Sequence, residues 1–291
     1  ATGECSVTVT APTATDNCAG TVTGTTSDPT TYNVQGSYVV TWTFDDGNGN
    51  TSTATQNVIV DDVTAPSAPT IADATGECSV TVSAPTATDN CAGTVTGTTS
   101  DPTTYNVQGS YVVTWTFDDG NGNTSTATQN VIVDDVTAPS APTIADATGE
   151  CSVTVSAPSA TDNCSGTVTG TTSDPTTYNV QGSYVVTWTF DDGNGNTSTA
   201  TQNVIVDDVT APAAPGSLPD VVAECSATLT APTASDNCAG TITATTTDPV
   251  SYIAQGNYTV TWTFDDGNGN VSSVDQNVII DDVTAPSAPT L

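Results

Sequence analysis

Aspartate, asparagine and cysteine are the residues of this chain whose types and spacing indicate chemistry. The turn Asp45-Asp46-Gly47-Asn48-Gly49-Asn50 groups carboxylates with amides, and the pair Asp61-Asp62 follows one strand length later. Carboxylate and amide oxygens suit hard cations such as Ca²⁺, which takes six to eight oxygen ligands. The sequence therefore directs attention to cation binding. The alternative interpretation of the turn is an ordinary polar hairpin, because Asp and Asn accept unusual backbone angles without any ion.

The charge of the chain is entirely negative. It has 32 acidic residues and no lysine, arginine or histidine. Such a chain needs cations from solution, and nucleic acid and anionic membranes are poor partners for it. Solubility alone is the alternative reason for the acidity. Catalysis is not expected, because the usual general base, Schiff-base amine and guanidinium group are all missing.

A fixed internal period organises the chain. Cys5, Cys78, Cys151 and Cys225 recur at steps of 73, 73 and 74 residues, and a second cysteine follows each at the same distance. The period predicts the repeats 1–66, which lacks its leading strand, 67–139, 140–212 and 213–286, with a further repeat starting at 287–291. Both ends lie within the repeat, so we expect the chain to be a fragment of a longer array.

Each repeat reads as a β module. Tyr38, Val40, Trp42 and Phe44 alternate with polar or outward residues, which is typical of a strand with one face in a core. The turn at 45–50 then predicts a hairpin with a second strand that ends at Val58-Ile59-Val60. Short Val- and Thr-rich strands indicate an all-β fold, a tandem array of immunoglobulin-like β-sandwich modules forming an elongated rod. The proline-rich linker from Asp61 to Pro69 predicts short, stiff connections.

Two motifs resemble known families. Thr15-Asp16-Asn17-Cys18, together with Asp46-x-x-Gly49-Asn50 before the last strand, resembles hyalin-repeat (HYR-like) domains. The exit from Val60 to Pro69 resembles the junctions of bacterial immunoglobulin-like repeats in giant surface adhesins. The resemblance covers all four copies, and it implies cell-surface adhesion in a bacterium and calcium bound by aspartates between modules.

The predicted metal ligands lie at the junctions. In such a sandwich the last strand carries its Asp pair to the far end of the module, where it faces the next hairpin turn. The expected sets are Asp61 and Asp62 with Asp118, Asp119 and Asn121; Asp134 and Asp135 with Asp191, Asp192 and Asn194; and Asp207 and Asp208 with Asp265, Asp266 and Asn268. Asp89-Asn90 is a lesser candidate, and Glu4, Glu77, Glu150 and Glu224 are as readily interpreted as solvated side chains.

The cysteines predict disulfides and an oxidising compartment. Two cysteines per repeat, separated by twelve residues, favour one internal bridge in each module: Cys5 with Cys18, Cys78 with Cys91, Cys151 with Cys164, and Cys225 with Cys238. A zinc site is not expected, because the chain has neither a CxxC motif nor histidine.

The predicted function is the stalk or shaft of an extracellular cell-surface adhesin or filament, with calcium making the junctions rigid. The expected partners are neighbouring repeats and other copies in a filament, without nucleic acid or membrane insertion. The alternative is that the modules themselves bind a glycan or a surface. A further possibility is that an end strand is donated to the next chain, because the first copy lacks its leading segment and the last ends with one.

Overall fold

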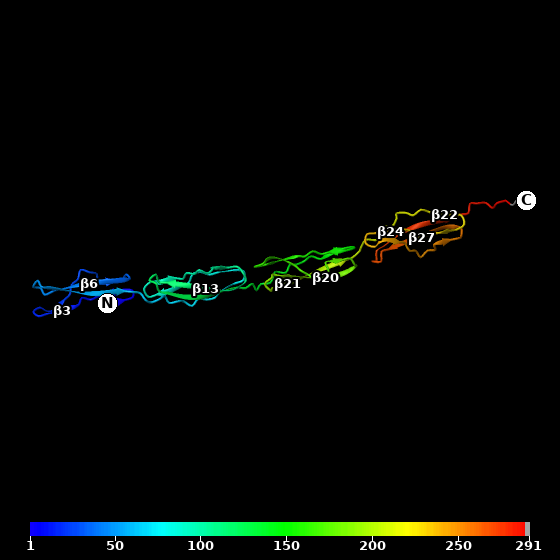
Figure 1. Cartoon of the computed structure of the whole chain (residues 1–291). Coiled ribbons are helices and arrows are strands. Elements are labelled where there is room, and N and C mark those ends of the chain that lie inside the picture. Colours follow the sequence, from blue (N-terminus) through cyan, green and yellow to red (C-terminus); the bar gives the residue numbers. More distant parts are fainter. Residues whose placement is uncertain (289–291) are drawn as a thin grey trace. The chain divides into compact units, whose positions relative to one another are not determined.

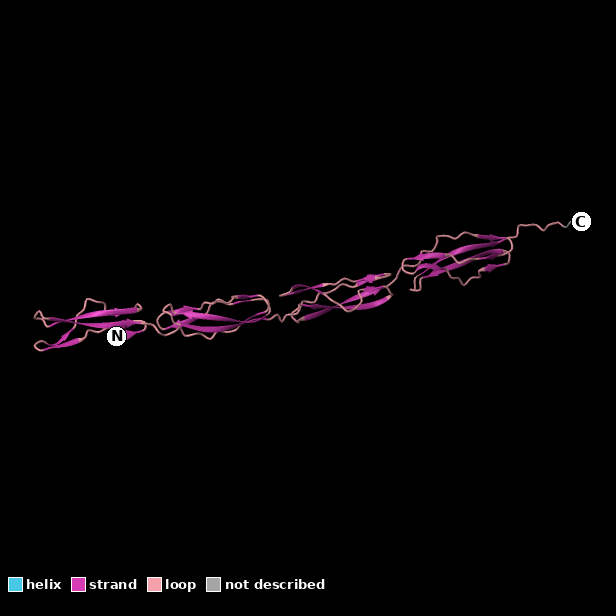
Figure 2. Cartoon of the chain, viewed as in Figure 1, coloured by secondary structure: helices cyan, strands magenta, loops and turns pink. Residues whose placement is uncertain are grey.

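The computed structural model describes residues 1–288, so most of the segment predicted to begin a further repeat lies outside the described residues. It divides into two compact units, Ala1–Thr137 and Ala138–Leu291. Figure 2 shows that the described residues form strands and loops, as the sequence predicts. Among residues 1–288 there is no helix long and apolar enough to span a membrane.

The first unit contains two modules of seven strands each, coloured blue and cyan in Figure 1. Module 1 consists of β1 (Thr2–Gly3), β2 (Val7–Thr8), β3 (Thr13–Asp16), β4 (Gly20–Thr23), β5 (Thr31–Tyr32), β6 (Gly36–Asp45) and β7 (Thr51–Val60). Module 2 consists of β8 (Ala74–Gly76), β9 (Val80–Thr81), β10 (Thr86–Asp89), β11 (Gly93–Thr96), β12 (Thr104–Tyr105), β13 (Gly109–Asp118) and β14 (Thr124–Val133).

The second unit repeats this order in modules 3 and 4. Module 3 consists of β15 (Ala147–Gly149), β16 (Val153–Thr154), β17 (Ser159–Asp162), β18 (Gly166–Thr169), β19 (Thr177–Tyr178), β20 (Gly182–Asp191) and β21 (Thr197–Val206). Module 4 consists of β22 (Val221–Ala223), β23 (Ala227–Thr228), β24 (Thr233–Asp236), β25 (Gly240–Thr243), β26 (Ser251–Tyr252), β27 (Gly256–Asp265) and β28 (Val271–Ile280).

A long antiparallel hairpin is the central element of every module. In module 1, β6 and β7 pair antiparallel from Gly36 opposite Val60 to Asp45 opposite Thr51, which confirms the predicted hairpin. The short β1 adds to β7 in parallel, with Gly3 opposite Val60. The hairpin turn and the end of β7 therefore lie at opposite ends of the module. This separation decides which residues face each junction.

Two further strand pairs complete the sandwich. β2 pairs with β5, β3 pairs with β4, and a bridge between Thr25 and Thr43 connects the chain after β4 to β6. The core lies between β2–β5 and the hairpin, where Val40 is fully buried and Trp42 is 3% exposed. Trp42 is therefore a core residue, as predicted. Val34 lies outside β5 and is 65% exposed.

Each module has its own hydrophobic core. The four cores draw on residues 7–60, 71–133, 144–206 and 214–280, all within the predicted repeats. The repeat boundaries themselves stay predictions. One position differs between modules: Phe117, Phe190 and Phe264 are fully buried, whereas Phe44 of module 1 is partly buried.

This difference predicts unequal costs for one substitution. Phe117→Ala removes a fully buried ring and should destabilise module 2 by about 3–5 kcal/mol. Phe44→Ala should cost module 1 clearly less, because its ring is partly exposed. Hydrogen exchange of β13–β14 and of β6–β7, measured by mass spectrometry, separates the two modules. Equal loss of protection in the two variants would contradict the assignment of the cores.

Candidate metal centre at the module junctions

One glutamine side chain connects the segment after β1 to the segment after β7 at the same end of module 1. Gln35 donates from Nε2 to the carbonyl of Glu4 at 2.9 Å and accepts the N–H of Asp62 at 2.8 Å. Thr64 donates its hydroxyl to Glu4 Oε2 at 2.8 Å and its N–H to Asp62 Oδ1 at 3.2 Å. These bonds connect the start of the module to the residues after β7. They place the carboxyl groups of Glu4 and Asp62 side by side.

The hairpin turn of module 2 supplies the opposite side of this junction. Gly120 and Gly122 have φ of 82° and 105°, in the region that favours glycine. The turn curls so that Asp119 Oδ1 accepts the N–H of Asn121 at 2.7 Å and of Asn123 at 3.0 Å. The alternation of Asp, Gly and Asn therefore gathers one carboxyl group and two amides at the end of module 2.

Amide groups join the two modules across the junction. Asn121 donates to Asp62 Oδ2 at 3.1 Å, and Asn123 donates to the carbonyl of Asp62 at 2.8 Å. Asn90, in the turn after β10, donates to Glu4 Oε2 at 2.5 Å. Asp62 is only 4% exposed. A buried carboxyl group is thus contacted by neutral donors alone.

Three carboxyl groups converge around Asp62. One oxygen each of Asp62, Asp89 and Asp119 lies within 4.8 Å of the others. Asp89 Oδ1 accepts the N–H groups of Cys91 and Ala92, but its Oδ2 is buried and has no hydrogen-bond partner among the described residues. A buried oxygen without a partner is costly unless a ligand contacts it. The donor set fits a hard cation.

The electrostatics of the turn favour the charged form of Asp119. Burial works to raise the pKa of this carboxyl group, but the Asn123 side chain and the backbone amides of Asn121, Asn123 and Gly122 outweigh it and hold the pKa below its usual value. The same balance lowers the pKa of Asp266 in module 4. Such a group stabilises the fold above its unfolded-state pKa and loses this contribution as the pH falls through its folded-state pKa.

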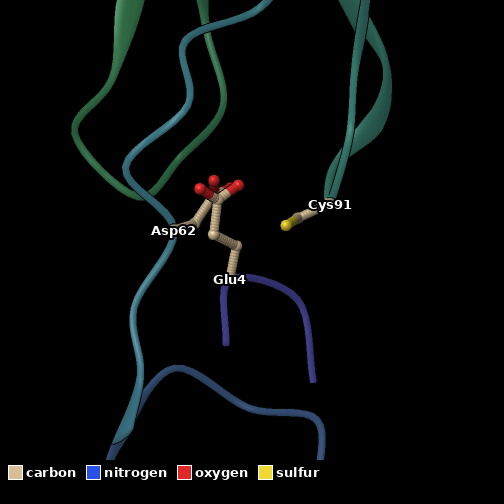
Figure 3. A group of neighbouring side chains, drawn as sticks. All are labelled: Glu4, Asp62 and Cys91. Atoms are coloured by element: carbon tan, nitrogen blue, oxygen red, sulfur yellow. The ribbon is translucent and has the colours of Figure 1, made fainter. Parts of the chain in front are cut away.

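A second group at the same junction combines Glu4, Asp62 and Cys91 (Figure 3). The two carboxylates lie side by side, and the Cys91 side chain points toward them. The sulfur of Cys91 is bonded to Cys5, so it is not a thiolate ligand. Glu4 and Asp62 are therefore the residues of this group with oxygens free to hold a cation, and Asp62 belongs to both groups.

The junction inside the second unit repeats this arrangement. Asn268 donates to Asp208 Oδ2 at 3.3 Å, and Asn270 donates to the Asp208 carbonyl at 2.7 Å. Asn237 donates to Glu150 Oε2. Asp208 is 3% exposed, and Asp236 Oδ2 is a buried oxygen without a hydrogen-bond partner among the described residues. By contrast Asp282, the equivalent residue at the end of module 4, is exposed.

The structure brings part of the predicted ligand sets together. Asp62, Asp119 and Asn121 lie together, as do Asp208 and Asn268, whereas a contribution from the other aspartate of each pair stays a prediction. Adjacent residues of an extended chain point in opposite directions. The exposed members are Asp61, Asp118, Asp207 and Asp265. The predicted set of Asp134, Asp135, Asp191, Asp192 and Asn194 draws on both units and stays a prediction.

Residues that the sequence indicates only as lesser candidates, or not at all, lie at the first junction. Asp89 and Glu4 supply carboxyl groups at the first junction, and Asn90 and Asn123 supply amides. A signal for them exists in the sequence, because the Asp-Asn-Cys motif and the Glu-Cys pair recur in every copy. What the sequence did not show is that Glu4, after β1, and Asp89, at the end of β10, meet at the same junction.

The predicted disulfides are also wrong in their pairing. Cys5 is bonded to Cys91 and Cys151 to Cys238, with Cα atoms 4.9 and 5.0 Å apart. These bonds exclude all four pairings within a module. Cys78 and Cys164 are disulfide-bonded as well. Cys18 and Cys225 are the free cysteines among residues 1–288, and both are exposed.

The reason lies in the length of the module. Cys5 follows β1, beside the end of β7, whereas Cys18 follows β3, whose Asp16 lies near Asp46 of the hairpin turn. A ten-residue strand extends roughly 33 Å, so the two cysteines of one module lie at opposite ends of it. The bridge instead connects the end of module 1 where β7 finishes to the end of module 2 that carries the hairpin turn.

Relatives of known identity share this repeat. The chain is 34% identical to hyalin of Strongylocentrotus purpuratus over 95% of its length, and 35% identical to hyalin of Lytechinus variegatus over 98%. The chain is a homologue of hyalin. It spans 26% and 61% of these two relatives, so it corresponds to a part of each. No family model matches the chain.

Solved structures also resemble the hyalin-like chain at low identity. The protocadherin GammaB4 extracellular domain is 17% identical, with 84% of this chain and 55% of that chain covered and a TM-score of 0.31. A Ca²⁺-stabilized adhesin with which an Antarctic bacterium binds ice is also 17% identical, with 90% and 87% covered and a TM-score of 0.31. Neither similarity bears on the function of the hyalin-like repeats, and their expected bacterial origin stays a prediction.

The disulfide between modules 1 and 2 predicts which thiol a substitution releases. In Cys91→Ser the partner Cys5 becomes free and should react with a thiol-specific label under non-reducing conditions, together with Cys18 and Cys225. The measurement is mass-spectrometric mapping of the labelled peptides. Labelling of Cys78 in place of Cys5 would restore the pairing within the module. The unmodified chain, labelled at Cys18 and Cys225 only, is the control.

Proposed function

We propose that this chain is a structural segment of an extracellular protein, in which calcium holds successive modules together. The observation that carries the proposal is the group of Asp62, Asp89 and Asp119, with Asp62 nearly fully buried and one Asp89 oxygen without a partner. The chain contains no basic side chain that could neutralise this group. A cation from solution is the remaining source of positive charge.

The energetics support a bound ion. Oxygens of the three carboxyl groups lie within 4.8 Å of one another, and two unit charges at about that distance repel by roughly 3.5 kcal/mol at an effective dielectric constant near 20. Three such pairs at the first junction would oppose the docking of the two modules. A divalent cation converts this repulsion into attraction. Oxygen-only donors favour calcium over zinc, since no histidine is present and Cys91 is in a disulfide.

The residues divide between two roles. Asp62, Asp89, Asp119 and Glu4 would hold the ion through carboxylate oxygens. Asn90 and Asn121 orient these carboxylates, and each amide also carries an oxygen that suits calcium. The disulfide between Cys5 and Cys91 keeps the two ends in contact whether or not the ion is bound.

A role in mechanical support outside the cell follows from the same features. The disulfides indicate an oxidising compartment, and the hyalin relatives consist in part of the same kind of sequence. The repeats would provide length and stiffness without catalysis, as the shaft of a surface protein or filament. Neighbouring repeats are the partners of each module. The activity and further partners of a whole protein are part of this proposal.

A recurring surface groove favours the alternative, binding of a glycan or surface. In module 1 it has a volume of about 410 Å³ and is lined by Asp28, Pro29, Tyr32 and Tyr38, and modules 2 and 3 have the same groove at about 440 and 420 Å³. The exposed Val39 borders it. Binding of the chain to immobilised glycans, lost in Val39→Asp and its equivalents, would support this alternative. Absence of binding would leave the structural role alone.

The calcium proposal predicts a local gain of stability. Calcium at about one hundred times its dissociation constant should stabilise a junction by roughly 2.7 kcal/mol. Hydrogen exchange of residues 86–93 and 118–123 should therefore slow on addition of calcium and recover in chelator. Asp62→Asn should abolish this response at the first junction, because it removes the carboxylate shared by both groups.

The neighbouring residue provides a matched control. Asp61→Asn removes the same charge from the exposed position next to Asp62 and should leave the calcium response unchanged. Equal responses in the two variants would show that calcium acts through general charge screening. No response in the unmodified chain would refute the metal centre.

A further inference from the structure

A groove with the same lining lies on modules 1, 2 and 3. In module 1 it is formed by side chains from residues 28–34 and from the start of β6, and it includes Pro29, Val34 and Val39. Val34 and Val39 are 65% and 57% exposed, so neither contributes to the core. Modules 2 and 3 carry the same residue types at all eight lining positions. Each groove therefore presents apolar surface in a concave setting, which is typical of a ligand site.

Two polar groups in the groove of module 1 have unused hydrogen-bonding capacity. Asp28 Oδ2 accepts the N–H of Thr41 at 2.7 Å, whereas its Oδ1 accepts no hydrogen bond from the described residues. Tyr32 is only 8% exposed, yet its hydroxyl has no hydrogen-bond partner within the same part of the chain. The hydroxyl of Tyr38, by contrast, donates to the carbonyl of Val34 at 2.9 Å. A mostly buried polar group is normally paired, so the two unpaired oxygens point to a ligand with hydrogen-bond donors.

The same groups make the groove attractive to a positive charge. The rings of Tyr32 and Tyr38 have centroids 4.6 Å apart, and the equivalent Tyr105 and Tyr111 of module 2 have centroids 4.5 Å apart. Burial, and next the negative charge of Asp28, raises the pKa of Tyr32, so its hydroxyl keeps its proton at neutral pH. Aromatic faces attract cations, and a nearby carboxylate adds to this attraction. The groove therefore favours a cationic ligand over a neutral or anionic one.

The shape and the charge of the groove together indicate the kind of cation. Its valines suit an apolar stem, while Asp28 and the tyrosines suit a positive head with several N–H donors. An arginine side chain combines both, because its methylenes cover apolar surface and its planar guanidinium stacks on aromatic rings and binds carboxylates through two N–H groups. No residue of this chain is an arginine or a lysine. We propose that the groove binds an arginine side chain of a different protein.

Other occupants match the groove less well. A calcium ion has no apolar part to cover Val34 and Val39. A glycan, the ligand considered above, offers hydroxyl groups without charge and leaves the attraction of Asp28 unused. A nucleic acid or an anionic lipid is repelled by a chain with 32 acidic residues and no basic ones. Charge complementarity thus favours a basic protein as the partner, and its binding does not depend on calcium at the junctions.

The repeat strengthens a contact that is weak by itself. Modules 1 and 2 carry two of these grooves in one compact unit. A partner that presents two suitably spaced arginines makes the second contact intramolecular, which raises the overall affinity. Module 4 keeps Asp248, Tyr252 and Tyr258 but has Thr259 where module 1 has Val39. Module 4 should therefore hold the arginine stem less well.

The test measures binding of the peptide acetyl-Gly-Arg-Gly-amide to the full chain by saturation-transfer nuclear magnetic resonance. Chelator is present, which keeps the result independent of the metal centre, and salt at about 0.15 M screens long-range attraction to the acidic surface. Saturation should reach the arginine methylenes. The same peptide with citrulline, which has the shape of arginine without its charge, should bind about tenfold more weakly. Equal binding of the citrulline peptide would overturn the proposal in favour of a neutral ligand.

Replacement of the groove aspartates provides the decisive variant. It changes one residue in each module: Asp28→Asn, Asp101→Asn, Asp174→Asn and Asp248→Asn. Asparagine can still accept the bond from Thr41 and its equivalents, so the fold should persist, whereas the affinity for the arginine peptide should fall about tenfold.

The matched control removes the same charge from an exposed position of each module: Asp61→Asn, Asp134→Asn, Asp207→Asn and Asp281→Asn. The control should bind the peptide as the unmodified chain does. Equal weakening in the two variants would show that the peptide responds to general charge, which would overturn the proposal.

A second variant keeps the proposal testable if the first one does not fold. Val39→Thr, Val112→Thr and Val185→Thr introduce the residue that module 4 has at Thr259, so each module should fold. Loss of the apolar wall should reduce saturation of the arginine methylenes and weaken binding by about threefold. Unchanged saturation and affinity would contradict the placement of the arginine stem in the groove.

Discussion

Uncompensated negative charge is the constraint on which the rest of this structure depends. The chain must dock the end of one module against the start of the next while carboxyl groups gather on both sides. Neutral amides of asparagine side chains reduce the cost, because they donate to carboxylates without adding charge. They leave the repulsion between the carboxylates in place. The disulfide holds the modules together despite this repulsion, and a bound cation would cancel it.

The sandwich fold confines the repulsion between carboxyl groups to the two ends of each module. The ten-residue strands of the hairpin set the distance between the two ends of a module, and the sheet pairing of β1 with β7 brings Glu4 to the same end as Asp62. The hairpin turn stands at the other end with Asp46 or its equivalents. A module therefore presents one half of the site at each end, and neither half is complete without a neighbour.

Three kinds of interaction with different requirements coincide at the junction. The disulfide depends on the redox state, the contacts of the carboxyl groups depend on charge, and the packing of Pro66 depends on burial. Because they occupy the same contact, loss of one leaves the other two to hold the modules together.

The sequence by itself determined the repeat, the all-β class, the hairpin with its Asp-Gly-Asn turn and the placement of tryptophan in the core. These follow from local patterns: a period of two in Tyr38 to Phe44, glycines at left-handed positions, and a fixed spacing of cysteines. It also indicated the acidic junction. Alternation along an extended chain also predicts that Asp61 and Asp62 point to opposite sides.

Only the tertiary structure decided which ends meet. Cys5 and Cys18 are close in sequence but lie at opposite ends of a module, and Cys5 and Cys91 are separated by 86 residues yet bonded. The same holds for Glu4 and Asn90, and for Asp62 and Asp89. Sequence distance predicts contact when the chain turns back within a hairpin. Sequence distance does not predict contact when the strands place two residues that are close in sequence, such as Cys5 and Cys18, at opposite ends of a module. The next repeat then supplies the bonding partner.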